Sequence, residues 1–289
     1  MEQRKIRLDD FYQVELTHVK GLVSPDFFAD APHSHEHCEL FIHLRGDLVI
    51  FVEQNRYHLS GGEIRVYRSG ELHCGKIEAP EEMEWYQISI PATFFLQKRN
   101  RSLSAVLFAR EAGEGNVFYS AAREQIRELL AEVFSLYGAE NPLWEHYAES
   151  AVRRILCLLN EGQRNRPISS RQNHVLRRIL DVINAEFGGI STVEELSRRT
   201  HYSVSYINRL FGDHMGMTPY RFLVAKKLNE AKKALLGGCS VTAACEYAGF
   251  NSYNNFITLF RKTFHRTPKQ YSGEREKNGM REEVSYDPC

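Results

Sequence analysis

Histidines near the amino terminus have a spacing that could do chemistry. His33 and His35 are two residues apart, and Glu39 follows them in the segment His-Ser-His-Glu-His-Cys-Glu. Imidazoles two residues apart on a β-strand point to the same face of a sheet. With a carboxylate and a further histidine from a neighbouring strand, they would form a site that binds a metal ion or the hydroxyl groups of a small molecule.

A second chemical signal lies in the segment SVSYINRLFGDHMG, which begins at Ser203. Ile207, Leu210 and Phe211 have the spacing of one helix face, so we expect them to be buried. Arginine reads guanine and asparagine reads adenine through paired hydrogen bonds in the major groove of DNA. The residues left nearer to solvent, which we predict to contact DNA, are Val204, Ser205, Tyr206, Asn208 and Arg209.

Charge is unevenly distributed along the chain, although the net charge is zero. From Arg171 to Ser272 there are 15 Lys and Arg residues against 7 Asp and Glu, whereas the remainder holds 22 against 30. Lys and Arg supply most non-specific affinity for nucleic acid because they neutralise phosphates. The basic part is therefore predicted to bind a polyanion.

The composition is that of a globular protein, with 43% hydrophobic and 26% charged residues. No apolar run approaches the roughly 20 residues that span a bilayer. The basic residues of the amino terminus are not followed by an apolar stretch, so this segment does not resemble a secretory signal. We expect a cytoplasmic protein whose 289 residues form two domains.

Two kinds of periodicity mark a first domain over residues 1–161. Between about 14 and 91 the runs ELFIHL, DLVIFVE, YHL, EIRVY and WYQISI alternate with period two, which predicts an all-β barrel or sandwich. Between about 121 and 161 the apolar period is helical, and Asn141-Pro142 divides it. We therefore expect an antiparallel hairpin of two helices, which would provide a homodimer interface.

The second domain is predicted to be a tandem helix-turn-helix over residues 173–272. A polar linker, 162–172, precedes it, and a charged tail, 273–289, is expected to be disordered. Ser203 is the expected N-cap of the first recognition helix. Thr218-Pro219 begins a long helix, and Ser240 then caps the start of a repeat of the same pattern.

The strongest resemblance to a known family lies in this second domain. The succession SYINRLF, GMTP, AKKALL, AGFNSYNNFITLFRKTF and TPKQY resembles the DNA-binding domain of AraC family transcription regulators. The resemblance implies two helix-turn-helix units that enter successive major grooves about 34 Å apart. Many members carry Arg where this chain has Thr258, so the second helix is expected to anchor on phosphates. The second-groove residues implied by position are Ser252, Tyr253, Asn254, Asn255 and Thr258.

The histidine segment resembles the first motif of the cupin superfamily, HxHxxxExxxxxxG, which ends here at Gly46. Gly70-Glu-Leu-His73 resembles the second motif. The resemblance implies a divalent metal held by His33, His35, Glu39 and His73. The usual Gly, Pro and Asn of the motifs are replaced by Phe27, Arg68 and Ile77. The alternative is therefore a hydrogen-bonded polar cluster without a metal, and this is the favoured interpretation.

The effector is expected to be a small polar metabolite such as a sugar. His43 is four residues after Glu39 on the same expected strand, so its side chain is expected to face the same cavity. Arg45 and Arg65 could pair with an anionic ligand, but isolated arginines on strands are usually exposed. The predicted effector residues are His33, His35, Glu39, His43 and His73.

The whole pattern predicts an α+β multidomain protein, with a cupin-like barrel and helical hairpin followed by an all-α tandem helix-turn-helix domain. Its expected function is a non-enzymatic, sequence-specific transcription regulator, by family habit an activator that works with RNA polymerase. One alternative is a metal-dependent cupin enzyme with an accessory DNA-binding domain. Another is an architectural DNA-binding protein without an effector.

Overall fold

A computed structural model describes residues 1–28, 32–53, 55–161, 165–168, 173–264 and 266–277, with only the main chain over 273–277. Close contacts divide the chain into two compact units. The first holds residues 1–30 and 34–171, and the second holds residues 172–289 with the short stretch 31–33. No helix within the described ranges is long and apolar enough to cross a membrane.

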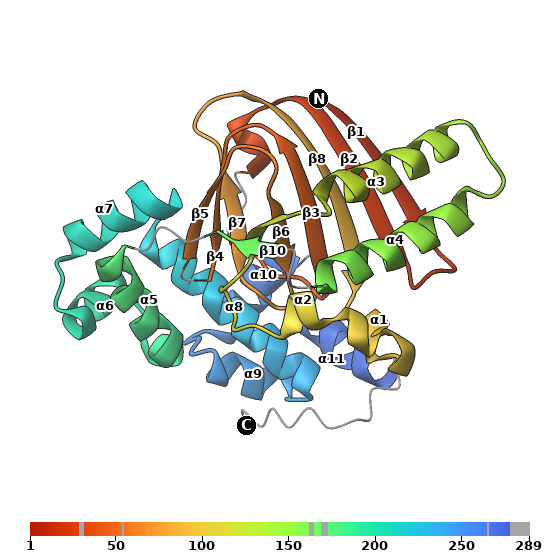
Figure 1. The fold of residues 1–289 in the computed structure, drawn as a ribbon. Helices are drawn as coiled ribbons and strands as arrows, with labels where there is room; N and C mark the ends of the chain where they lie inside the picture. The colour runs from red at the N-terminus through yellow and green to blue at the C-terminus, as the bar shows by residue number, and fades with distance from the viewer. Residues whose placement is uncertain (29–31, 54, 162–164, 169–172, 265, 278–289) are drawn as a thin grey trace. The chain divides into compact units, whose positions relative to one another are not determined.

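Two antiparallel sheets form the first unit (Figure 1). The larger has the strand order β1-β2-β8-β3-β6-β9-β10, and the smaller has the order β5-β4-β7. The strands are β1 Glu2–Leu8, β2 Val14–Val23, β3 His37–Arg45, β4 Leu48–Val52, β5 Asn55–Leu59, β6 Ile64–Tyr67, β7 His73–Lys76, β8 Glu81–Pro91, β9 Val117–Ser120 and β10 Asn165–Pro167. The prediction of a β-rich amino-terminal domain is confirmed.

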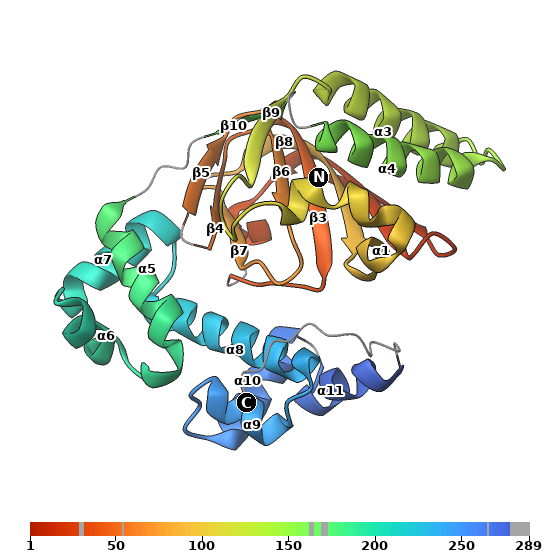
Figure 2. The ribbon, with the colours of Figure 1, turned by 60° about the horizontal axis from the view of Figure 1, so that its bottom comes forward.

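Strand β3 contributes to two apolar cores. Leu40 and Ile42 pack in a core shared with helices α3 (Arg123–Gly138) and α4 (Trp144–Asn160), the pair expected between 121 and 161 (Figure 2). Phe41 instead packs with residues of the smaller sheet in a core between the sheets, here called the barrel interior. Because side chains two apart share a face, Glu39 and His43 also point toward the barrel interior.

Shorter helices complete the first unit. Three of them, α1 Thr93–Leu96, η2 Lys98–Leu103 and α2 Ala105–Phe108, connect the end of β8 to β9 and pack beside α4, with Phe94, Phe95 and Leu107 in the same core as Leu40. The fourth, η1 Pro25–Phe28, lies between β2 and β3.

The larger sheet extends beyond the segment predicted to form the barrel. Strand β1 pairs with β2 along its whole length, from Glu2 opposite Lys20 to Leu8 opposite Val14. At the other edge β9 pairs with β6, and β10 pairs with β9. Strand β10 lies within the predicted linker 162–172, whose residues 162–164 and 169–172 fall outside the described residues.

Helices alone form the described part of the second unit from residue 173. They are α5 His174–Glu186, η4 Phe187–Gly189, α6 Val193–Thr200, α7 Val204–Met215, α8 Pro219–Gly237, α9 Val241–Tyr247, α10 Tyr253–Phe264 and α11 Pro268–Lys277. The predicted all-α second domain is confirmed. Helix α11 runs into the segment 273–289 that was expected to be disordered, and residues 278–289 lie outside the described residues.

Hydroxyl side chains begin helices of the second unit, as expected at Ser203, Thr218 and Ser240, and also at Thr192. Thr192, Ser203, Thr218 and Ser240 each accept a hydrogen bond from the main-chain N–H three residues later. Such caps satisfy donors that the first helical turn leaves without a partner. Helix α6 ends at His201 in the left-handed conformation, with φ 59°, and this turn directs the chain into α7.

Candidate functional site

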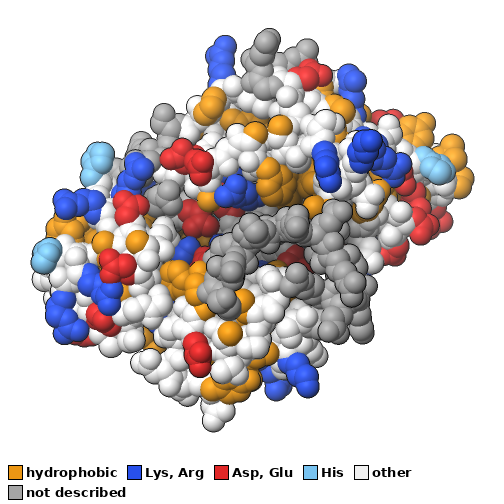
Figure 3. Space-filling view, turned by 90° about the horizontal axis from the view of Figure 1, so that it is seen from below, with side chains coloured by type: hydrophobic (Ala, Val, Ile, Leu, Met, Phe, Trp, Pro, Cys, Tyr) orange, Lys and Arg blue, Asp and Glu red, His pale blue; other side chains and the backbone are white. Residues whose placement is uncertain are grey.

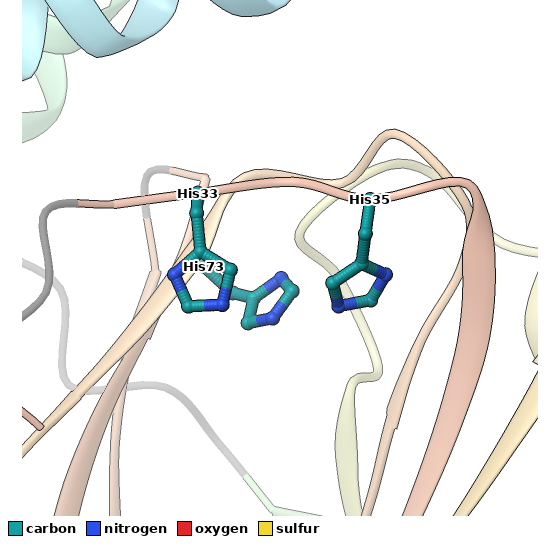
Figure 4. A group of neighbouring side chains, drawn as sticks. All are labelled: His33, His35 and His73. Carbon is teal, nitrogen blue, oxygen red and sulfur yellow. The ribbon is translucent and has the colours of Figure 1, made fainter. Parts of the chain in front are cut away.

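Three histidines come together at one end of the barrel interior. His33 and His35 precede β3 rather than lying on it, and His73 is the first residue of β7. One ring nitrogen from each lies within 4.8 Å of the others. Figure 4 shows the rings of His33 and His35 projecting from one segment, with the ring of His73 between them. The structure therefore brings together the three histidines that the cupin resemblance implied.

Glu39 faces two of these rings. Its Oε2 lies 3.1 Å from Nε2 of His35 and 3.8 Å from Nε2 of His73. Its Oε1 accepts a hydrogen bond of 2.7 Å from the side-chain amide of Gln87. The ring of Tyr67 stacks on His73 with centroids 4.1 Å apart. The carboxylate is thus held beside His35 and His73 by strands β3 and β8.

Main-chain carbonyl groups fix the tautomers of the His35 and His73 rings. Nδ1 of His35 is 2.9 Å from the carbonyl oxygen of His37, and Nδ1 of His73 is 2.9 Å from that of Glu71. A carbonyl only accepts, so each Nδ1 carries the hydrogen. Each Nε2 then presents a lone pair to the Glu39 carboxylate, which is favourable only with a proton or a metal ion between them. This arrangement, with Nδ1 bound to a carbonyl, is also typical of metal-ligating histidine.

A buried ion pair holds the loop that carries His73. Arg110 donates to both carboxylate oxygens of Glu71 at 2.8 Å, and the main-chain N–H of Gly113 donates to Oε1 at 2.7 Å. Burial raises the pKa of Glu71, but the hydrogen bonds and charge of Arg110, together with the main-chain N–H groups of Gly113 and Arg68, outweigh it and hold the pKa below its usual value. A charged Glu71 therefore fixes the main chain to which His73 is bonded.

His43 lies outside the group formed by His33, His35 and His73, but it points toward the barrel interior, as its spacing from Glu39 predicted. Its side chain is fully buried on β3, and its Nε2 donates to the carbonyl oxygen of Gly46 at 2.6 Å. Burial lowers the pKa of His43 to about 4. The ring is therefore neutral at physiological pH, with Nε2–H as the donor and Nδ1 as an acceptor that faces the barrel interior.

The low pKa of His43 predicts a loss of stability in mild acid. In the unfolded chain the imidazole titrates near its ordinary value of 6.5, so the unfolded state binds a proton first as the pH falls. The free energy of unfolding should decrease by about 3 kcal/mol in total from pH 6.5 down to about 4. Urea unfolding at several pH values measures this. The free energy of unfolding of the variant His43→Gln should depend less steeply on pH. An equal pH dependence for both proteins would contradict the low pKa of His43.

Arg65 departs from the expectation that strand arginines are exposed. Arg45 at the end of β3 is exposed, but Arg65 in β6 is only 3% exposed. It lies opposite Phe41, with the guanidinium carbon 4.0 Å from the ring centroid. The sequence gives no local sign of this burial, which depends on the pairing of β6 with β3.

Helix α7 presents the first predicted DNA-reading residues. Ile207, Leu210 and Phe211 are buried as expected. Ser205, Asn208 and Arg209 are exposed, whereas Val204 and Tyr206 are half-buried. The Arg209 guanidinium lies over the ring of Tyr206 at 5.2 Å, so an aromatic face supports the arginine expected to read guanine.

The second set of predicted DNA-contacting residues lies on and just before helix α10, where two of the side chains are held by local hydrogen bonds. Ser252, Tyr253, Asn254, Asn255 and Thr258 are all exposed. The Ser252 hydroxyl is the acceptor of the Asn255 main-chain N–H at 3.3 Å, and the Thr258 hydroxyl donates to the Asn254 carbonyl at 2.9 Å. Two of the five side chains are therefore bonded within the helix itself.

Sequence reasoning overlooked Arg261 in the last turn of α10. It is exposed and lies three residues after Thr258 and seven after Asn254, which places it on the same helix face. That spacing was visible in the sequence. On the face drawn in Figure 3, basic and acidic side chains are interspersed rather than gathered in one patch.

Two family models match this chain. The model described as AraC-like ligand binding domain matches residues 24–156, and a helix-turn-helix domain model matches residues 196–274. Together they cover most of the chain and fall on the first and second units respectively. The predicted division of labour between a ligand-binding and a DNA-binding part is thereby confirmed.

Similar whole proteins are also regulators by name. The HTH-type transcriptional activator RhaS of Escherichia coli O157:H7 is 25% identical over 247 residues, which cover 83% of this chain and 87% of that protein. RhaS of Pectobacterium carotovorum is 26% identical over 151 residues, which cover 52% of this chain and 54% of that protein.

Two solved structures are also similar to this chain, with low TM-scores. ToxT from Vibrio cholerae O395 is 9% identical, covers 92% of this chain and 98% of its own, and has a TM-score of 0.36. The C-terminal domain of the response regulator yesN from Fusobacterium nucleatum is 28% identical, with a TM-score of 0.33 over 35% of this chain and 99% of its own. From the two family models and the RhaS matches, the chain belongs to the AraC family of DNA-binding transcription regulators and carries the ligand-binding domain of that family.

Proposed function

We propose that this regulator activates transcription in response to a small polar metabolite, such as a sugar, that enters the barrel interior. The observation that carries the proposal is the group of His33, His35, Glu39 and His73, which places polar donors and acceptors within a domain matched by a ligand-binding model. The activating role is supported by the RhaS relatives, which are named transcriptional activators.

A reporter experiment tests this function. The promoter is first identified by selecting genomic fragments that bind the purified full chain, and is then placed before a reporter gene. We expect transcription to rise with one carbon source and not with others. The variant His35→Ala should bind the promoter as well as the wild type but lose the response. Repression by the wild type, or an equal response by the variant, would contradict the proposal.

The DNA contacts are assigned to two unequal helices. We assign base reading to Val204, Ser205, Tyr206, Asn208 and Arg209 in one major groove. Ser252, Tyr253, Asn254, Asn255 and Thr258 lie in the next, with Arg261 added as a phosphate contact. The internal hydrogen bonds of Ser252 and Thr258 support an anchoring role for α10.

Self-association is assigned to the helical hairpin of the first unit. Its far end exposes Tyr137, Leu143 and Tyr147, at 42%, 53% and 44% of their surfaces. Grouped exposed apolar side chains are typical of interaction surfaces. A symmetric homodimer would present two DNA-binding units to repeated half-sites and to RNA polymerase in the cytoplasm. Light scattering of Leu143→Arg against wild type tests this assignment.

The histidine cluster fits a divalent ion in its donor chemistry. His33, His35, Glu39 and His73 would hold it, and a bound ion would supply a Lewis-acidic position for an effector hydroxyl. We expect zinc added to chelator-treated protein to raise its Tm by several degrees, because an ion that binds only the folded state stabilises it. The variant His73→Ala should lose this rise, whereas His58→Ala, which changes an exposed histidine, should keep it. If wild type shows no rise, the metal-free polar cluster is the correct interpretation.

A further inference from the structure

Arg65 lies in the barrel interior and forms no close ion pair among the described residues, although the charges of Glu39 and Glu63 act on it. One side of its planar guanidinium is covered by the ring of Phe41. A ring face attracts the cation but does not accept the five N–H groups, which point outward in the guanidinium plane. Among the described residues, no side chain or carbonyl accepts a hydrogen bond from the guanidinium of Arg65, and its Nε is completely enclosed.

The nearest acidic residues are engaged elsewhere. Glu63 accepts hydrogen bonds from the main-chain N–H groups of Ser60 and Gly61, and Glu39 serves the histidine cluster described above. No carboxylate oxygen lies within 4.0 Å of the Arg65 nitrogens in the described part of the chain. Burial lowers the pKa of Arg65, but a guanidinium stays protonated in proteins. A buried, unpaired charge of this kind destabilises a fold unless something binds it.

Two more enclosed nitrogens lie on the same sheet, on the neighbouring strand β3 and on the next strand, β8. Nδ1 of His43 and Nε1 of Trp85 are both buried without a partner among the described residues. Trp85 lies directly opposite His43 in the pairing of β8 with β3. Arg65, opposite Phe41, is the diagonal neighbour of His43 on the same face. Because Nε2 of His43 donates to Gly46, its Nδ1 is an acceptor, whereas the indole N–H of Trp85 is a donor.

We propose that the effector is a hydroxy carboxylate of the sugar-acid class, with its carboxylate on Arg65 and a hydroxyl donating to Nδ1 of His43. The proposal rests on the proposed function, since it names the class of metabolite that the barrel interior receives. One guanidinium neutralises one carboxylate, whereas a phosphate monoester would bring a second negative charge. A neutral sugar would leave the charge of Arg65 unpaired.

Thermal unfolding of the full chain tests this effector class. The probes are sodium gluconate and sodium galacturonate, each compared with its neutral counterpart, sorbitol or galactose, and with glucose 6-phosphate at equal ionic strength. We expect at least one sugar acid to raise Tm by about 5 °C or more near saturation. The neutral compounds and the phosphate should leave Tm unchanged.

Two substitutions of Arg65 and one control complete the experiment. Arg65→Met and Arg65→Gln should abolish the rise while their own Tm, without any probe, stays equal to that of wild type or exceeds it. Arg45→Gln, which changes an exposed arginine of β3, should keep the rise. A Tm of both Arg65 variants well below wild type would show that the arginine is structural, and would overturn the proposal.

Other outcomes separate this inference from the function on which it rests. A rise with galactose or glucose 6-phosphate alone, a rise that survives both Arg65 substitutions, or no rise with either acid would overturn the sugar-acid assignment. Binding to the selected promoter is measured on the same samples by fluorescence anisotropy. If promoter binding is intact while the acids fail, only the effector class is wrong; if promoter binding also fails, the proposed function is wrong.

Discussion

Replacing Asn208 and Arg209 together by alanine is expected to remove most of the sequence preference of this regulator. Both side chains are exposed on α7, and Arg209 is supported by the ring of Tyr206. A bidentate contact to a base is worth about 1–3 kcal/mol of discrimination. The two losses together should lower the affinity ratio of promoter over scrambled duplex by roughly 100-fold, since about 1.4 kcal/mol corresponds to tenfold.

Anisotropy titrations of both duplexes measure this ratio. Arg209→Lys keeps the positive charge but not the fork of donors, so it should lose preference while retaining affinity for scrambled DNA. Asn255→Ala in α10 should weaken binding to both duplexes to a similar, smaller extent, because that helix is assigned to anchoring. A double variant of α7 with an unchanged ratio would show that the base-reading helix is assigned wrongly.

Gly249→Ala is expected to unfold the second helix-turn-helix at moderate temperature. Gly249 has φ +69°, where L-residues are strained, and an added Cβ would overlap the carbonyl oxygen of Gly188 and lie 2.6 Å from its carbonyl carbon. The Gly249 carbonyl also accepts a 2.7 Å hydrogen bond from Lys227 on α8, so the segment has little room to move. The strain of the left-handed conformation and the overlap with Gly188 should together lower the free energy of unfolding by about 3 kcal/mol.

A glycine on α7 provides the matched control. A Cβ at Gly212 would meet nothing within 4 Å, and alanine is a better helix former than glycine by up to about 1 kcal/mol. Gly212→Ala should therefore raise the Tm slightly, whereas Gly249→Ala should lower the Tm of the second unit by about 10 °C. Calorimetry of the full chain checks both. A Gly249→Ala variant as stable as wild type would contradict the close approach of the two glycines.

Local signals made the second unit largely predictable from sequence. The N-caps at Ser203, Thr218 and Ser240 act within three residues, and the buried positions Ile207 and Phe211 follow from helical spacing. Each of these features is set by neighbours along the chain. The family resemblance then added the order of the helices.

The first unit was harder to predict because its strands pair over long distances. Strand β10 at Asn165 pairs with Ser120, and β9 at Val117 pairs with Arg65. Neither short strand has an alternating pattern long enough to detect. The histidine cluster was predictable from its motif, but the burial of Arg65 required knowing that β6 pairs with β3 at Phe41.

Sequence-specific binding to DNA is the central claim, and a salt titration tests it most directly. The full chain is titrated onto its selected promoter and onto a scrambled duplex from low to physiological salt. We predict that affinity for both duplexes falls steeply as salt rises. Each phosphate that the protein contacts should contribute a loss of about 0.9 logarithmic units for every tenfold rise in salt. The promoter should remain preferred by roughly 1,000-fold or more at physiological salt. Affinity that is insensitive to salt, or equal for the two duplexes, would contradict the claim.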